Sequence, residues 1–413
     1  MRPAPFTISD VADLLRIQRL EGGNDNAFNV ECPFCGDRRG KCNFCVVKDG
    51  EIKNVYHCFA CGASGNMLTL YADIMGLRGK ERYKDAYWEI RDNMPQDPKE
   101  TRRHQRKIEV QAQKQKETSA EPVDYQKRNE VYGALIKMLH LSETHRNDLR
   151  RRGQTEDEIR RMEQRGYVST DSSNSVAIAR RLIKQGYDLE GIPGFYVNRN
   201  GDWEIAFYKK SNGYLCPVWS EDRLLVAFQI RLDQPYKKRK YIWLTSAGLE
   251  KGCSSGSPVG VSGSSYAKRV YVTEGISKAE ITYQRTGRTH LGNPGVSNHK
   301  ELRQVLIHLK ERGLEEVIEE ADMDKLMVLH CQEDYDEACR MCECKGAEEC
   351  PKKRIKRDNI RKGCLKLYQI CEELGIPCKR RIWDFDENGM WLGNYKGIDD
   401  WELREEKPET MAA

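Results

Sequence analysis

The chain has 413 residues, of which 38% are hydrophobic and 32% charged, and its formal net charge is +5. This length accommodates two or three domains, and the charged fraction predicts an extensive solvated surface. No apolar run approaches the length that spans a bilayer, and none of signal-peptide type follows Met1, so we expect a cytoplasmic protein with no membrane partner. In that compartment, 16 cysteines indicate metal sites and exclude a disulfide framework.

The first predicted feature is a zinc ribbon, preceded by a short helix over Ile8 to Leu20. Two C-x-x-C pairs at this separation predict four thiolates in a closed tetrahedral shell, which is a structural zinc site. A third pair leaves ligand exchange or a second ion open, although strand positions between the knuckles suit it better. The expected ligands are Cys32, Cys35, Cys58 and Cys61, and the third pair is Cys42 and Cys45.

A charged linker is predicted from residue 94 to 123, where Lys, Arg, Gln and Glu replace nearly all apolar residues. We favour a solvated spacer, with contact to nucleic-acid phosphates as the alternative. A helical pattern follows from Tyr125 to Tyr167 and contains Arg152. On the residues alone, this arginine suits a helix end on the surface.

Residues 195–245 are predicted to be rich in strands. Strands over 214–219 and 224–231 are joined by a polar turn. A basic cluster interleaved with aromatic residues comes next and includes Lys240 and Tyr241. This pattern is typical of contacts with a nucleic-acid backbone and stacked bases, and a plain charged loop is the alternative.

An α/β sheet is predicted from residue 270 onward, with acids at the ends of its strands. Glu274 follows the apolar run Val270 to Val272, and Asp322 and Asp324 follow Val317-Ile318, with two helical patterns between. Metal sites in such sheets lie beyond the carboxyl ends of the strands, and carboxylates suit Mg²⁺ there. The alternative is that these acids are merely solvated strand ends.

Taken in order, these motifs resemble the DnaG-type DNA primases, in a phage or mobile-element version. Cys-Pro-Phe-Cys and His-Cys-Phe-Ala-Cys-Gly resemble their zinc-binding domain, and Glu-Gly, Gly-Asn-Pro-Gly and Asp-x-Asp resemble their toprim domain. The segment Lys396-Gly397-Ile398-Asp399-Asp400 resembles the acidic motif that closes toprim. The resemblance implies four parts: a zinc ribbon (1–93), the linker (94–123), an α+β core subdomain (124–265) and an α/β toprim domain (266–413).

The resemblance also implies a role for each candidate site residue. One departure matters, because many primases carry an Asp four residues after the Glu, where this chain has Lys278, and this leaves the number of metal ions open. The residues implied to hold or assist Mg²⁺ or Mn²⁺ are Glu274, Asp322, Asp324, Asp399 and Asp400. Those implied to line the cleft for template and nucleotide are Arg152, Arg231, Lys240, Tyr241 and Lys251.

A second cysteine group follows the Asp-x-Asp acids. Five thiols within twenty residues suggest a second zinc site, although their spacing is irregular and ordinary free cysteines are the alternative. The five are Cys331, Cys339, Cys342, Cys344 and Cys350.

The function that the resemblance implies is synthesis of short RNA primers on single-stranded DNA from nucleoside triphosphates. The chain has no G-x-x-x-x-G-K-[ST] loop, so any helicase partner would be a separate protein. Two other classes stay open: a catalytically impaired single-stranded-DNA-binding protein, and a toprim nuclease or topoisomerase.

Overall fold

The computed structural model describes residues 6–48, 50–79, 81–94, 110, 119–236, 239–295, 298–332, 335, 339 and 346–404. The chain divides into two compact units. The first contains Met1–Ala120, Lys237–Arg239 and Gly248–Lys251, and the second contains Glu121–Tyr236, Lys240–Ala247 and Gly252–Ala413. Most of the predicted linker lies outside the described residues. The predicted division into four parts stays a prediction.

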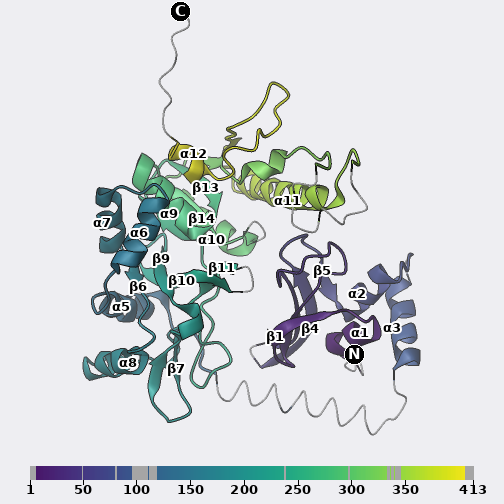
Figure 1. Cartoon of the computed structure of the whole chain (residues 1–413), viewed down its shortest axis with the longest axis horizontal. Coiled ribbons are helices and arrows are strands. Elements are labelled where there is room, and N and C mark those ends of the chain that lie inside the picture. Colours follow the sequence, from purple (N-terminus) through teal and green to yellow (C-terminus); the bar gives the residue numbers. More distant parts are fainter. Residues whose placement is uncertain are drawn as a thin grey trace, which may run out of the picture. The chain divides into compact units, whose positions relative to one another are not determined.

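The first unit is a five-stranded antiparallel sheet with short helices packed against it. Its strands are ordered β1-β2-β3-β4-β5, so each pairs with its neighbour in the sequence (Figure 1). Buried Val30, Phe44, Tyr56 and Leu70 form its core. The elements are α1 (Ile8–Leu14), β1 (Arg19–Gly23), β2 (Ala27–Val30), β3 (Cys42–Lys48), β4 (Glu51–Cys58), β5 (Ser64–Asn66), α2 (Met67–Ile74) and α3 (Arg82–Asn93).

The prediction of one helix from Ile8 to Leu20 is wrong at its far end. Helix α1 stops at Leu14, because Arg16 adopts a left-handed conformation (φ 53°) and the Ile17 N–H donates back to the Ala12 carbonyl at 2.9 Å. The chain then turns into β1. At the start of α1, Thr7 and Asp10 form a capping box.

The first part of the second unit is a four-stranded sheet, ordered β11-β10-β9-β6, with helices beside it (Figure 1). The predicted strands over 214–219 and 224–231 are confirmed as β9 and β10, and the helical region from Tyr125 as three helices. The elements are α5 (Tyr125–Ile136), α6 (Glu143–Arg151), α7 (Glu156–Gln164), β6 (Val168–Ser169), α8 (Ser175–Lys184), β7 (Phe195–Val197), β8 (Trp203–Ile205), η1 (Lys209–Ser211), β9 (Gly213–Trp219), β10 (Leu225–Tyr236) and β11 (Arg239–Trp243).

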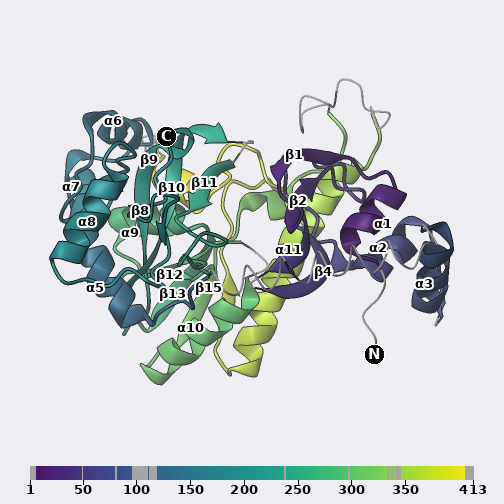
Figure 2. The ribbon, with the colours of Figure 1, turned by 90° about the horizontal axis from the view of Figure 1, so that it is seen from below.

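The second part of this unit is the predicted α/β sheet. Its five strands are ordered β12-β14-β13-β15-β16, and β13 is central and parallel to both neighbours. Helices α10 and α11 share one core with the strands, and α9 packs on the sheet from the side of the first part (Figure 2). The elements are β12 (Gly260–Ser262), β13 (Arg269–Glu274), α9 (Ile276–Thr286), β14 (His290–Asn293), α10 (His299–Glu311), β15 (Glu316–Glu319), η2 (Met323–Leu326), α11 (Pro351–Glu373), β16 (Cys378–Arg380) and α12 (Ile398–Glu402).

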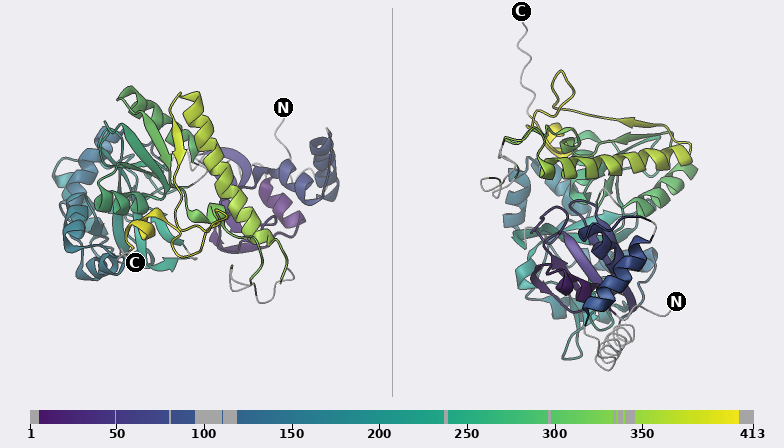
Figure 3. Two further views of the ribbon diagram at one scale, coloured as in Figure 1. Left: turned by 90° about the horizontal axis from the view of Figure 1, so that it is seen from above. Right: turned by 90° about the vertical axis from the view of Figure 1, so that its right-hand side faces the viewer.

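A long helix and a short strand lie near the end of the chain. Helix α11, the long helix in Figure 3, begins at Pro351, where a proline at the first position suits a helix start. Strand β16 covers Cys378–Arg380. After it the chain leaves the sheet, because Trp383 is buried against Met323 and Ile398 and Asp384 turns with φ 53°.

Among the described helices, none has both the length and the hydropathy needed to cross a bilayer.

Candidate functional site

The four predicted zinc ligands come together in the first unit. The Sγ atoms of Cys32, Cys35, Cys58 and Cys61 all lie within 4.8 Å of one another. The distance is 3.8 Å from Cys32 to Cys61 and 3.9 Å from Cys35 to Cys58. Zn–S bonds of about 2.3 Å in a tetrahedron require about 3.8 Å between sulfur atoms, so this cluster fits one zinc ion.

Each pair of cysteines is held by a tight backbone turn. The N–H of Gly36 donates to the Cys32 carbonyl, and the N–H of Gly62 donates to the Cys58 carbonyl, both at 2.8 Å. Both glycines have positive φ, 65° and 75°, a conformation that residues with a side chain rarely adopt. The local sequence therefore favours the turn that each knuckle needs.

Cys42 lies directly beside this cluster. It is fully buried on β3, opposite Cys58 on β4. Cys42 is not among the four thiols that lie within 4.8 Å of one another. Cys45 also lies on β3, paired with Val55. Both cysteines thus occupy strand positions between the knuckles.

The predicted acids of the second unit gather at the carboxyl edge of the parallel strands. Glu274 is the last residue of β13, opposite Asn293, and Gly275 (φ 98°) turns the chain into α9. A Cβ on Gly292 would lie 2.8 Å from the Ile276 Cα, so only glycine lets α9 begin this close to β14. Asp322 and Asp324 follow β15 at the start of η2, and both are buried.

Three lysines neutralise these acids. Lys278 of α9 hydrogen-bonds to Asp322 Oδ1. The Lys396 Nζ lies 3.3 Å from Asp322 Oδ2 and 2.9 Å from Asp324 Oδ2. The Lys356 Nζ, on α11, lies 2.5 Å from Asp324 Oδ2. The sequence motifs contain Lys278, as a departure from the resemblance, and Lys396, whereas Lys356 belongs to no motif and approaches from the distant α11.

Burial and these charges shift the pKa of the acids in opposite directions. Burial, helped by the charge of Asp322, raises the pKa of Glu274. Burial also opposes the charge of Asp322, but the ammonium groups of Lys278 and Lys396 outweigh it and lower the pKa of Asp322. Asp322 is therefore held ionised in the site, whereas the ionised form of Glu274 is disfavoured by burial and by the charge of Asp322.

The closing acidic motif contributes one carboxylate to this group and leaves the other outside. Asp399 is buried in the first turn of α12, whereas Asp400 is exposed. A Cβ on Gly397 would lie 2.3 Å from Asp399 Oδ1 and 3.0 Å from Lys278 Nζ, so glycine lets these two groups approach. Burial raises the pKa of Asp399, and the charge of Lys278 acts against it.

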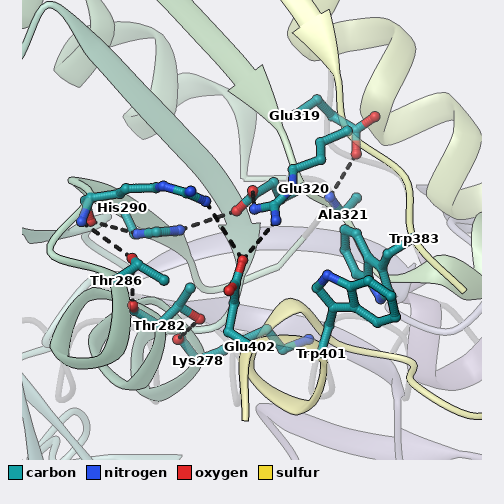
Figure 4. A network of polar contacts seen from close by, with 12 residues as sticks. Lys278, Thr282, Thr286, His290, Glu319, Glu320, Ala321, Trp383, Trp401 and Glu402 are labelled. Carbon is teal, nitrogen blue, oxygen red and sulfur yellow. Dashed lines mark hydrogen bonds and ion pairs between the residues drawn. The ribbon is translucent and has the colours of Figure 1, made fainter. Parts of the chain in front are cut away.

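An ion-pair network that the sequence did not predict fixes α12 beside the sheet. Arg381 bridges Glu320 Oε1 (2.8 Å), at the end of β15, and Glu402 Oε1 (2.7 Å), on α12. The buried His290 Nε2 lies 3.1 Å from the other oxygen of Glu320 (Figure 4). In addition, the Met323 N–H donates to the Lys396 carbonyl at 2.9 Å. Together these contacts position the closing motif against the acids.

Three of the predicted cleft residues come together in the first part of the same unit. The Arg152 Nη1 donates to the Tyr241 hydroxyl at 2.9 Å, and the Arg231 guanidinium lies 5.3 Å from the Tyr241 ring centroid. Arg231 is also paired with Asp148 at 3.2 Å. Next to Arg152, a Cβ on Gly153 would lie 3.4 Å from Leu403 Cδ1, so this cluster adjoins the end of α12, the helix that carries Asp399.

The other two predicted cleft residues are Lys240 and Lys251. Lys240 is exposed on β11, next to Tyr241. Lys251 belongs to the first unit and has a left-handed backbone (φ 55°). Its predicted role stays a prediction.

The second cysteine group is described only in part. Cys331, Cys339 and Cys350 are buried, whereas Cys342 and Cys344 lie outside the described residues. Within the part of the chain that the structure describes, the N-terminal four-cysteine cluster is the metal-ligand group found. The second zinc site stays a prediction.

Comparison with known proteins identifies the first unit. Residues 7–103 match the CHC2 zinc finger family of DnaG zinc ribbons. This class of zinc-binding domain is therefore present here. The match confirms the predicted resemblance to DnaG zinc ribbons for these residues, and a phage origin stays a prediction. No curated protein matches the chain.

Solved structures of primases overlap with parts of the chain. The Aquifex aeolicus primase (zinc-binding and RNA polymerase domains) matches at 13% identity and TM-score 0.37, covering 76% of this chain and 70% of that one. The Mycobacterium tuberculosis DnaG RNA polymerase domain, in complex with a double-stranded DNA oligomer that has a 6-nucleotide overhang, matches at 14% identity and TM-score 0.39. That match covers 59% of this chain and 82% of that one. A DnaG catalytic domain bound to single-stranded DNA matches at 16% identity and TM-score 0.30, and this match covers 47% of this chain and 62% of that one. Overlaps of this size carry no argument about activity.

Proposed function

We propose that this protein is a DNA primase that joins nucleoside triphosphates into short primers on a single-stranded DNA template. The observation that carries the proposal is the group of Glu274, Asp322 and Asp324 at the carboxyl edge of a parallel sheet. This is the place where α/β proteins bind their ligands. A CHC2 zinc ribbon of the DnaG class precedes it in the same chain, which supports a role on DNA.

The acids fit a divalent metal ion. Asp324 Oδ1 and Asp399 Oδ1 are buried and have no hydrogen-bond partner, so both oxygens are available to a ligand. Carboxylate oxygens are the ligands that Mg²⁺ and Mn²⁺ prefer. Glu274, Asp322 and Asp324 would hold the ion, and Asp399 would assist. When bound, the ion supplies activation of the 3′ hydroxyl and stabilisation of the leaving pyrophosphate.

Basic and aromatic side chains next to the acids suit the other reactants. Lys356 and Lys396 reach the acids with side chains that are 34% and 45% exposed, so their charges also face solvent, where a triphosphate would arrive. The Arg152–Arg231–Tyr241 cluster combines guanidinium groups with an aromatic ring. Such a surface stacks bases and holds phosphates without regard to sequence.

Incorporation of labelled nucleotides tests the proposal. The full chain is incubated with single-stranded templates of varied sequence, labelled ribonucleoside or deoxyribonucleoside triphosphates, and Mg²⁺, Mn²⁺ or a chelator. We expect short products that require both template and metal. Failure to incorporate any nucleotide on any template would overturn the proposal.

A second candidate is a single-stranded-DNA-binding protein without catalytic activity. Lys278, in the position of an expected acid, and the neutralisation of Asp322 and Asp324 by lysines favour it. Intact binding of labelled single-stranded DNA without incorporation would support this candidate. Cleavage of the labelled template would instead indicate a toprim nuclease.

A further inference from the structure

The three lysines around the acids differ in the exposed fraction of their side chains. The Lys278 side chain is 17% exposed, compared with 34% for Lys356 and 45% for Lys396. Lys278 also lies on α9 directly after the β13 turn, a rigid position. Lys356 and Lys396 reach in from the rim on long flexible stems and can move outward without leaving a hole in the core.

Lys278 places its ammonium group where carboxylates from three segments converge. It hydrogen-bonds to Asp322 Oδ1 after β15, and its charge acts on Glu274 at the end of β13 and on Asp399 in α12. The Gly397 backbone packs against the same ammonium. The Lys278 ammonium therefore supplies positive charge among these carboxylates.

Asp399 Oδ1, near Lys278, and Asp324 Oδ1 are buried carboxylate oxygens without a hydrogen-bond partner, and the Asp324 carboxylate is the one that the rim lysines contact. Asp324 is fully buried, its Oδ1 has no hydrogen-bond partner, and its Oδ2 meets the two rim lysines. A divalent ion can therefore reach Asp324 once Lys356 and Lys396 swing outward. A second ion near Asp322 would have to approach the buried Lys278 charge, which repels it at short range.

We propose that Lys278 acts as a built-in cation in the acidic site, so that the site takes one divalent ion, held on the Asp324 side, instead of two. This inference rests on the proposed function, in which these acids hold the metal ion. It makes Lys278 the residue that determines how many metal ions the site takes. It also predicts that a substitution at one position changes that number.

Counting Mn²⁺ ions bound to the full, zinc-loaded chain tests the inference. Electron paramagnetic resonance of free Mn²⁺ gives the number bound and their affinities for the wild type, Lys278→Asp and Lys278→Gln. We expect one Mn²⁺ in the wild type. Lys278→Asp should bind two, and Lys278→Gln should bind its first ion on the order of tenfold more tightly, because a nearby positive charge is removed. The control is Lys268→Gln, whose side chain is 78% exposed.

The outcomes separate this inference from the proposed function. Two tight Mn²⁺ ions in the wild type, or a single ion in a folded Lys278→Asp protein, would overturn the inference even if primers are made. If Lys278→Asp does not fold, unchanged affinity in Lys278→Gln would overturn it as well. One Mn²⁺ in the wild type and two in Lys278→Asp, without any nucleotide incorporation, would support the inference and contradict the primase proposal.

Discussion

Lys278 on α9 and Asp322 after β15 form a buried ion pair that joins the two segments carrying the acids. The pair holds Asp322 ionised at the sheet edge. It also leaves Glu274 buried beside a fixed negative charge, because Asp322 cannot take up a proton easily. The expected consequences for stability, binding and activity can be measured separately.

Glu274→Gln should stabilise the protein at neutral pH when no divalent ion is present. Burial and Asp322 raise the pKa of Glu274 in the folded state, so ionised Glu274 costs stability above that raised pKa. As pH falls through the raised pKa toward the unfolded value near 4.5, wild-type Glu274 takes up a proton and the cost disappears. Urea unfolding of both proteins at pH 7.5 and pH 4.5 measures this. If the stability advantage of Glu274→Gln over the wild type were larger at pH 4.5 than at pH 7.5, the assigned direction of the Glu274 pKa shift would be contradicted.

Arg381→Gln should loosen α12 and lower the stability of the second unit. Arg381 is partly exposed and bridges Glu320, which is fully buried, and Glu402. Removing its charge leaves Glu320 with only His290 as a partner, at a cost on the order of 2 kcal/mol. Denaturant unfolding measures this loss, and Arg380→Gln, on the exposed neighbour, is the control. Equal effects of the two substitutions would argue against the network.

Tyr241→Ala should weaken binding of single-stranded DNA by about 5- to 100-fold, because one stacked base is worth about 1–3 kcal/mol. Tyr241→Phe keeps the ring and loses only the hydroxyl that accepts a hydrogen bond from Arg152. It should therefore bind nearly as well as the wild type. Fluorescence anisotropy with a labelled oligonucleotide gives both affinities, and equal losses in the two variants would exclude stacking on this ring.

Cys58→Ser should remove zinc and unfold the first unit, because metal binding and folding are coupled in ribbons of this kind, with about 10–16 kcal/mol of apparent binding energy. Cys45→Ser, on β3 outside the four-cysteine cluster, should keep its zinc. Elemental analysis with circular dichroism measures both. Full zinc content in Cys58→Ser would contradict the assigned ligand set.

The same elemental analysis examines the predicted second zinc site. If it exists, the wild type contains two zinc ions per chain and Cys339→Ser loses one of them. One zinc ion in both proteins would eliminate that prediction.

Much of the site could be predicted from sequence because its signals are local. Two knuckles with glycines identify the zinc ligands, and the apolar runs before Glu274 and Asp322 identify the strand ends. The contacts of Lys356, Lys396 and Arg381 could not be predicted, because the partners of these residues lie far along the chain and only the packing of α11 and α12 brings them together. The end of α1 was missed because an arginine at positive φ gives no signal in the sequence. Lys251 was grouped with Lys240 by resemblance, whereas the structure assigns it to the other unit.

The most direct measurement compares templated primer synthesis by the wild type, Asp324→Asn and Asp157→Asn. Asp324 is fully buried among the acids, whereas the Asp157 side chain on α7 is 73% exposed. If these acids form the catalytic metal site, the wild type and Asp157→Asn make short products with Mg²⁺ or Mn²⁺, and Asp324→Asn loses at least roughly 100-fold in rate. Undiminished synthesis by a folded Asp324→Asn protein, or no synthesis by the wild type alongside intact DNA binding, would contradict this account.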